Sequence, residues 1–446
     1  MAARQHRFSV FRFLPLRWTG FTALAIGLLV SFFGRLLPPN PLQAEPPPTP
    51  PALARILEST WQGYKHTFIQ ADGRVIDRQA ADISTSEGQG YAMLRAVWMN
   101  DPETFNRVYQ WSIQNLKVRG DQLFAWKWGR RTEAFWRLHP NEPQQQTWGL
   151  LDHHSASDAN QDIALALILA AQQWKQPQYQ QQAQALLNAM WDKETLSTPV
   201  GRVLLPGDWR YSSQPNSVRI NPSYWAPYAY RVFAQVDSTH PWMELVESSY
   251  LLLDRLQQQA SHPLVPDWAE LSLVDGQLHP CQDSPSANDF GNEAVRLLWR
   301  LELDRLLNPG ERRANRTLQR LYQPIGQAYQ QHQQWPGKLS LQQSSSQFAP
   351  METRATAGIL LPSALRFQPK VGGRLLREVL GWQSVNQPGL WEPTTDYYAQ
   401  NWLWFGLWLA NAQQNGTGGI ERLPVLERLP HLANQAKRLP PSRTTP

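Results

Sequence analysis

The stretch "STSEGQGYAMLRAVWM", Ser84 to Met99, decides the fold. Its second half is an apolar run, which predicts a helix in the core of the domain. Its first half is polar: three hydroxyl residues precede Glu87, and Gly88 and Gly90 come directly after it. A lone carboxylate therefore stands at the start of a helix that otherwise resembles core.

An acid at a helix start ordinarily caps free N–H groups and opposes the positive end of the helix dipole. That explanation is weak for Glu87, because the three hydroxyl residues before it already offer caps. Gly88 and Gly90 weaken the helix, but they let a ligand approach the backbone closely. Glu87 is therefore a candidate functional residue.

The rest of the body has a helical period, so we expect an all-α domain. Helices are expected at residues 53–68, 88–98, 102–117, 159–174, 177–191, 222–234, 241–258, 288–303, 309–330, 351–365, 372–381 and 397–412. Long irregular loops are expected at 120–155 and 198–221, and "GRVLLP" is the one clear strand signal. Twelve helices can form six hairpins that close into an (α/α)6 barrel. A two-domain helical solenoid is the alternative, but no repeat of fixed length is visible.

The N-terminus is typical of an export signal. Four arginines precede the apolar core "FTALAIGLLVSFFG", and "LQA" at residues 42–44 suits a cleavage site. Residues 1–44 are thus a signal peptide or an uncleaved membrane anchor, and the body is periplasmic or extracellular. Residues 45–52 form a Pro-rich linker. We expect the helical domain at 53–414 and a flexible tail at 415–446.

Charge and cysteine content exclude several classes of function. The two ends, residues 1–50 and 426–446, carry +4 and +3 of the net +6, which leaves about −1 for residues 51–425. Without a basic stripe, a nucleic-acid partner is not expected. Cys281 is the single cysteine, so neither an internal disulfide nor a thiolate zinc cage can form. The ten histidines are scattered, and we expect no metal and no other cofactor.

Acidic residues also occur at two further helix starts. Asp158 and Asp162 lie in "ASDANQDIALALILAAQQW", and Asp289 and Glu293 lie in "NDFGNEAVRLLW". Capping explains most acids in such positions, and Asp158 resembles a cap even if it has a function.

Several of these motifs resemble glycoside hydrolase family 8. "TSEGQGYAM" resembles the sequence around the family's general acid, and "ASDANQDIALALILAAQQW" resembles its second signature, with Asn160 in place of the usual acid. Further similar segments are "WQGYKHTFIQADGRVID", "LFAWKWG", "INPSYWAPYAYRVFAQV" and "DYYAQNWLWFGLWL". The resemblance runs from about Trp61 to Ala410 and is strongest to the periplasmic endoglucanases of cellulose-synthesis systems. It implies an (α/α)6 barrel, in agreement with the helix count.

The resemblance also implies an inverting glycosidase, in which one carboxylic acid protonates the leaving oxygen and a second carboxylate activates water. Glu87 is then the acid, and its pKa must be raised by burial or by a like charge such as Asp158. The family's Tyr-Asp-Ala-x-Arg run corresponds to Asn292–Arg296. Three alternatives arise: Glu293 is the base, Asp289 replaces it, or the activity is weakened. Arg296 would orient the base or a sugar hydroxyl.

Aromatic side chains in the matched motifs are candidate sugar platforms. Sugars stack their C–H faces on flat rings, and the 21 tryptophans indicate either a large core or a surface that stacks on flat ligands. We expect sugar contacts from Trp126, Trp209, Tyr224 and Tyr397. The alternative is that half of the loop tryptophans merely pin loops to the barrel; these tryptophans are Trp126, Trp128, Trp136, Trp148 and Trp209.

The sequence therefore predicts an exported, monomeric endo-β-1,4-glucanase that acts on cellulose or a related β-glucan beside a cellulose synthase complex. A xylanase or chitosanase of the same family is one alternative. A glucan-binding protein with a decayed base is another, and a helical scaffold of the secretion machinery is a third.

Overall fold

The computed structural model describes residues 50–138, 147–341 and 348–414. The expected export segment 1–44, most of the linker 45–52 and the tail 415–446 lie outside the described residues. The first described helix, α2 (Pro50–Phe68), begins inside the Pro-rich segment, since proline is tolerated in the first turn of a helix. No helix within the described ranges is long and apolar enough to span a membrane.

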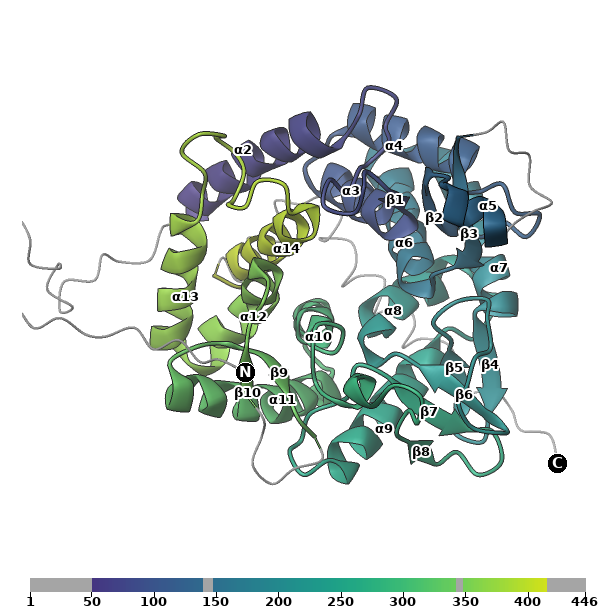
Figure 1. Cartoon of the computed structure of the whole chain (residues 1–446), viewed down its shortest axis with the longest axis vertical. Coiled ribbons are helices and arrows are strands. Elements are labelled where there is room, and N and C mark those ends of the chain that lie inside the picture. Colours follow the sequence, from purple (N-terminus) through teal and green to yellow (C-terminus); the bar gives the residue numbers. More distant parts are fainter. Residues whose placement is uncertain (1–49, 139–146, 342–347, 415–446) are drawn as a thin grey trace, which may run out of the picture. The chain divides into compact units, whose positions relative to one another are not determined.

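Twelve of the thirteen α-helices within the described residues form two concentric rings (Figure 1). The inner helices are α3 (Ser86–Trp98), α6 (Ser157–Trp174), α8 (Pro227–Val236), α10 (Arg296–Leu307), α12 (Arg354–Phe367) and α14 (Tyr397–Gln414). The outer helices are α2, α4 (Pro102–Asn115), α7 (Pro177–Lys193), α9 (Met243–Gln259), α11 (Arg312–His332) and α13 (Pro369–Gly381). Each inner helix packs on one outer helix, and α14 packs on α2 to close the ring. This arrangement confirms the expected (α/α)6 barrel.

Inner and outer helices differ in how much of their surface is buried. Every residue of α6 from Ser157 to Ala170 is buried, which requires a helix that is apolar nearly all round. The outer helix α11 instead buries one stripe at helical spacing, including Leu318, Leu321 and Ile325. Polar side chains on the inner helices are therefore taken out of water and need partners.

The expected helix at 288–303 is wrong at its start. Pro285–Asn288 forms a 3₁₀ turn, Phe290 makes a β-bridge with Leu339, and α10 begins only at Arg296. The expected helix at 222–234 is also split, into a 3₁₀ turn at Pro222–Tyr224 and α8. Pro227 explains the split, because it disfavours helical backbone at the residue before it.

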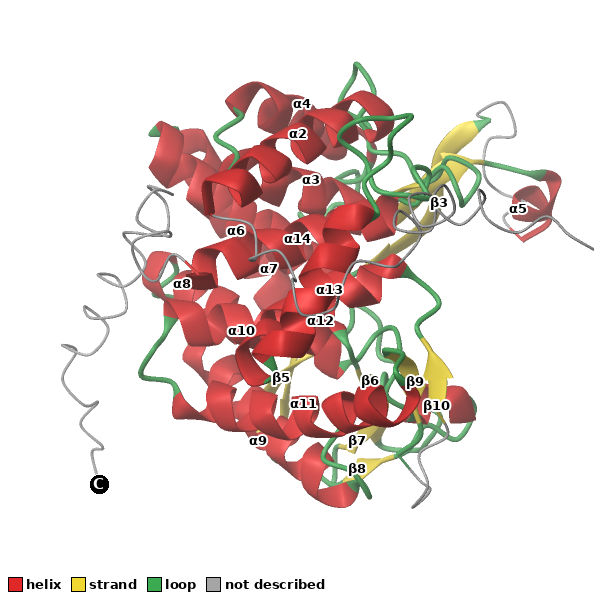
Figure 2. Ribbon diagram, turned by 90° about the vertical axis from the view of Figure 1, so that its left-hand side faces the viewer, coloured by secondary structure: helices red, strands yellow, loops and turns green. Residues whose placement is uncertain are grey.

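The loops expected to be irregular contain short strands and a short helix. β2 (Ala125–Arg130) and β3 (Trp148–Ser155) form an antiparallel ribbon, beside which lies α5 (Glu133–Leu138). The remaining paired strands are β4 (Thr195–Thr198), β5 (Gly201–Leu204), β6 (Ser217–Ile220), β7 (Ala269–Ser272), β8 (Leu278–His279), β9 (Pro336–Leu339) and β10 (Phe348–Pro350). Only β5 carries the strand signal seen in the sequence. Figure 2 shows β3, β9 and β10 on the right-hand side of the helical body.

The ribbon is joined to the helix that carries Glu87. β1 (Ser84–Thr85) pairs with β2, with Ser84 opposite Trp128 and Thr85 opposite Lys127. Register shifts on both sides of Lys127 break the alternation of side chains, which is why periodicity did not reveal the strand. The pairing fixes the entry of α3 against the ribbon that carries Trp126.

Candidate active site

The start of α3 is capped as the hydroxyl residues predicted. Thr85 is the N-cap, and its Oγ1 accepts the N–H of Gly88 at 3.0 Å, so the Glu87 carboxylate is not needed as a cap. The approach of a ligand to Gly88 and Gly90 stays a prediction. A Cβ at Gly88 or at Gly90 would lie no closer than 3.4 Å to its neighbours, among them Tyr397 and Ile163 of α6, so both positions have room for a methyl group.

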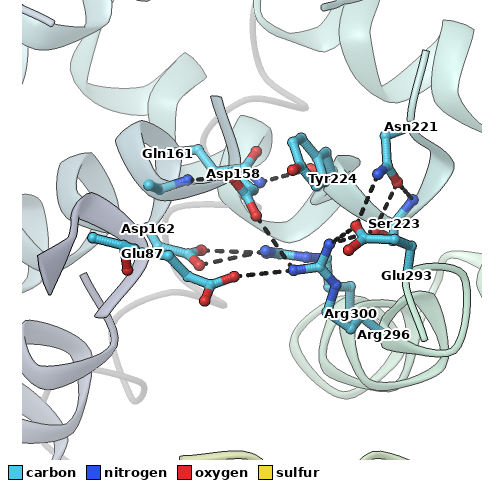
Figure 3. A network of polar contacts seen from close by, with 12 residues as sticks. Glu87, Asp158, Gln161, Asp162, Asn221, Ser223, Tyr224, Glu293, Arg296 and Arg300 are labelled. Carbon is cyan, nitrogen blue, oxygen red and sulfur yellow. Dashed lines mark hydrogen bonds and ion pairs between the residues drawn. The ribbon is translucent and has the colours of Figure 1, made fainter. Parts of the chain in front are cut away.

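The buried guanidinium of Arg296 contacts three of the acidic residues (Figure 3). Arg296, the first residue of α10, donates from Nη1 to Glu87 Oε2 at 3.1 Å and to Asp158 Oδ2 at 3.4 Å. Its Nη2 donates to Ser223 Oγ at 3.1 Å and to Glu293 Oε2. The Arg296 cluster is thus Arg296 with Glu87, Asp158, Ser223 and Glu293.

The surroundings of Glu87 raise the pKa of its carboxyl group. Burial raises its pKa, the charge of Arg296 opposes the rise, and the negative charge of Glu293 adds to it. Tyr397 Oη donates to Glu87 Oε1 at 3.2 Å. The side chain still exposes 22% of its surface, so a ligand can reach it.

Asp158 lies deeper in the cluster. Its side chain is 4% exposed, and burial raises its pKa to about 7, against the opposing charge of Arg296. Its Oδ1 accepts the N–H of Ala159 at 2.9 Å, while the N-cap of α6 is Ala156, without a side-chain cap. Asp158 therefore adds negative charge beside Glu87 rather than capping the helix in the ordinary way.

Glu293 faces Glu87 across the guanidinium. It is 34% exposed, and Asn221 Nδ2 donates to its Oε2 at 2.9 Å. Asn221 and Arg296 thus hold the carboxylate of Glu293 in place. Asp289 is placed differently: its carboxylate pairs with Lys338 at 2.9 Å.

The sequence motifs contained residues whose roles were missed. Asn221 and Ser223 lie in "INPSYW", which was recognised, but the side chains that reach Glu293 and Arg296 were not singled out. Asn221 Oδ1 accepts from the N–H and the hydroxyl of Ser223, so the two residues form one rigid turn. An Asn-Pro-Ser turn between two elements was the available signal.

Three of the four expected sugar-binding aromatics line one pocket. Trp126, Trp209 and Tyr224 border a pocket of about 590 Å³, together with Asp152, His154 and Tyr211. Tyr224 links the pocket to the cluster, since the Arg296 guanidinium lies 5.3 Å from the centre of its ring. Tyr397 is placed elsewhere: it is 7% exposed and contacts Glu87.

The other loop tryptophans pack on protein. Trp128 and Trp148 stack with ring centres 5.4 Å apart, and the Arg74 guanidinium lies against both rings. Trp136 lies beside Arg131. These contacts tie the β2–β3 ribbon to the barrel. Within the described ranges, no group of three His, Cys, Asp or Glu side chains is placed to hold a metal ion.

A second arginine lies one turn further along α10. Arg300 meets Asp162 with two hydrogen bonds, at 3.2 and 3.3 Å, and donates to Tyr228 Oη at 2.9 Å. Both charged side chains are almost fully buried, at 2% and 5% exposure. This pair joins α6, α8 and α10 inside the barrel and offers no surface to a ligand.

Comparisons with known proteins place the chain in a family. The model of glycosyl hydrolases family 8 matches residues 52–371. An endoglucanase of Cellulomonas uda is 32% identical over 241 residues, which are 54% of this chain and 62% of that protein. An endoglucanase of Escherichia coli K12 is 34% identical over 220 residues, which are 48% and 55% of the two chains. The matches thus span little more than half the length of these relatives.

A solved family 8 endoglucanase of Klebsiella pneumoniae superposes with a TM-score of 0.60 at 25% identity, covering 80% of this chain and 99% of that one. The family model covers far more than half of the sequence and includes Glu87, Asp158 and Glu293. The resemblance seen in the motifs is confirmed, and the chain belongs to family 8 of the glycosyl hydrolases.

Proposed function

We propose that the protein hydrolyses internal β-1,4-glucosidic bonds of cellulose or a related β-glucan, with inversion at the anomeric carbon. The observation that carries this proposal is the pair of reachable carboxylates, Glu87 and Glu293, held on the two amino groups of one buried guanidinium. The endoglucanase names of its relatives support the substrate class.

In this mechanism Glu87 gives its proton to the glycosidic oxygen as the bond to the anomeric carbon breaks. Glu293 takes a proton from the water that attacks the opposite face of the sugar. Glu87 ends ionised and Glu293 ends protonated. Proton exchange with solvent then returns both carboxyl groups to their starting protonation states. Burial of Glu87 favours the protonated starting state, while Arg296 stabilises the anion that remains after proton transfer.

The neighbouring residues have distinct tasks in the proposal. Asp158 places a partial negative charge near the sugar whose anomeric carbon becomes positive. Tyr224, Trp126 and Trp209 bind successive sugars in the adjoining pocket, and Tyr397 orients Glu87. Asn221 and Ser223 fix Glu293 and Arg296, so that the longer glutamate side chain has one defined position.

Release of reducing ends from a soluble cellulose derivative tests the proposal. We expect the wild type to be active and Glu87→Gln to fall to background. Equal background for both proteins, with tight calorimetric binding of cellopentaose, would instead support a non-catalytic glucan-binding protein. Parallel assays on xylan and chitosan test the family's other activities, for which the near-neutral body gives no support.

We propose further that the protein is exported and works on glucan as a cellulose synthase complex releases it. The basic and apolar segment within residues 1–44 supports export, and the motif resemblance supports the link to synthesis. Fractionation of cells that express the full chain, with N-terminal sequencing of the product, decides between cleavage and anchoring. Recovery of the intact chain in the cytosol would contradict export.

A further inference from the structure

Asp267 is a second carboxylate on the Glu293 side of the cluster, and no step above uses it. It lies in the connection between α9 and β7, 26 residues before Glu293 in the sequence. We propose that Asp267 is the positioning residue of Glu293: it holds the turn Gly291–Ala294 so that the base points at the attacking water. This inference rests on the proposed function of Glu293.

The contacts of Asp267 bracket Glu293. Its Oδ1 accepts the backbone N–H of Gly291 at 2.9 Å and that of Ala294 at 2.7 Å. Its own N–H donates to the carbonyl of Asp289 at 2.8 Å. One residue therefore fixes the backbone before and after the proposed base.

The same turn leads directly into α10. The N–H of Val295 bonds to the carbonyl of Gly291 at 3.1 Å, and that of Arg296 bonds to the carbonyl of Glu293 at 3.1 Å. The side chain of Asp267 thus acts where a local cap would, although it comes from a distant loop. Its loss would move Glu293 and the first residue of α10 together.

The charge of Glu293 acts on the carboxyl group of Asp267. Burial raises the pKa of Asp267 to about 6, the N–H group of Ala294 opposes the rise, and the negative charge of Glu293 adds to it. Because two N–H groups occupy Oδ1, the geometry favours a holding role. The Asp267→Asn variant described below separates this role from that of a base, because an amide oxygen accepts the same N–H groups but cannot take a proton from water.

Gly291 shows how closely the carboxylate is packed. A Cβ at this position would lie 2.6 Å from Asp267 Oδ2 and 3.3 Å from its Cγ. The turn therefore needs glycine here for space. A methyl group would displace the carboxylate, so Gly291→Ala perturbs the same contact from the other partner.

The experiment compares Asp267→Ala, Asp267→Asn and Gly291→Ala, each alone and combined with Glu293→Gln, by kcat and KM on cellopentaose. Wild-type activity and its loss in Glu87→Gln, in the same assay, first establish the proposed function. We then expect Asp267→Ala and Gly291→Ala to lower kcat by about 100-fold, the scale of an ångström of misplacement, with KM nearly unchanged. Asp267→Asn should stay near wild type, because its amide oxygen accepts the same two N–H groups.

In the Glu293→Gln background neither substitution should lower kcat further, since residues that act as a unit are not additive. Calorimetric binding of cellopentaose checks that each variant is folded. If Asp267→Ala does not fold, Gly291→Ala replaces it as the variant that disturbs the contact, and Asp267→Asn remains the variant that keeps it. The proposal is overturned if Asp267→Ala keeps wild-type kcat, or if the losses add in the Glu293→Gln background. An equal loss in Asp267→Asn and Asp267→Ala would also overturn it and make Asp267 the base.

Discussion

Arg296 and Arg300 lie one turn apart on α10, and both are buried, yet they bind acids in opposite ways. Arg300 meets one carboxylate, Asp162, with both of its amino groups, and a tyrosine completes a closed pair. Arg296 is shared among Glu87, Asp158 and Glu293, which come from three different segments. Two of those three acids remain reachable from solvent.

The difference shows how one helix serves both the fold and the site. At the depth of Arg300 every charge has its partner, so the pair joins inner helices and does nothing else. At Arg296 three acids share one cation. Burial raises the pKa values of Glu87 and Asp158, and the single positive charge of Arg296 offsets only part of this rise. Substitutions in the Arg300–Asp162 pair should change stability, and substitutions in the Arg296 cluster should change activity.

The largest expected effect is on the proposed base, Glu293. Glu293→Gln should lower kcat by about 10²–10⁴-fold, the usual contribution of general acid–base catalysis, and should leave the melting temperature near wild type. Asp289→Asn is the matched control, because Asp289 pairs with Lys338 outside the Arg296 cluster. A comparable loss in Asp289→Asn would transfer the role of base to that residue.

The next largest effect is expected in the closed pair of Arg300 and Asp162. Arg300→Met leaves the Asp162 carboxylate buried without its cation, which costs about 3–5 kcal/mol of folding free energy. Tyr228→Phe removes one hydrogen bond from the same pair and should cost about 1 kcal/mol. Thermal unfolding of both variants measures the difference. A melting temperature for Arg300→Met equal to that of Tyr228→Phe would refute the structural role of the pair.

A smaller effect is expected in the pocket. Trp209→Ala should raise KM for cellopentaose by about 10-fold, since truncation of a buried aromatic contact costs more than 1 kcal/mol of binding. Trp148→Ala is the control, because Trp148 stacks on Trp128 instead of lining the pocket. Equal changes in KM would show that the ribbon, rather than the pocket, binds the glucan.

The smallest expected effect is a shift of the pH profile. The hydrogen bond from Tyr397 stabilises ionised Glu87 and so lowers its pKa. Tyr397→Phe removes that bond, the pKa of Glu87 rises, and the acid stays protonated to higher pH. The alkaline limb of kcat/KM should therefore move to higher pH, whereas a move to lower pH would contradict the assignment of Glu87 as the acid.

The fold was largely predictable because the inner helices are apolar over long runs, as in α6, and Thr85 caps α3 locally. The start of α10 was not predictable: residues 288–295 have a helical pattern, but Asp267, from another loop, holds them in a turn. Most strands were not predicted for a similar reason: β2, for example, is bulged and pairs with segments far along the chain.

The site was predictable as separate motifs but not as an arrangement. Glu87, Asp158 and Glu293 each lie near a recognisable helix start, and their sharing of Arg296 exists only once α3, α6 and α10 are packed together. Asn221 and Asp267 are single polar residues in loops, where sequence offers no periodicity to mark them.

The stereochemistry of the fresh product tests the central claim most directly, because an acid and a base on opposite sides of the sugar must invert the anomeric carbon. Proton NMR during the first minutes of cellopentaose hydrolysis separates the two anomers before they equilibrate. Catalysis by Glu87 and Glu293 as an inverting pair predicts that the α-anomer appears first. Initial accumulation of the β-anomer would contradict it.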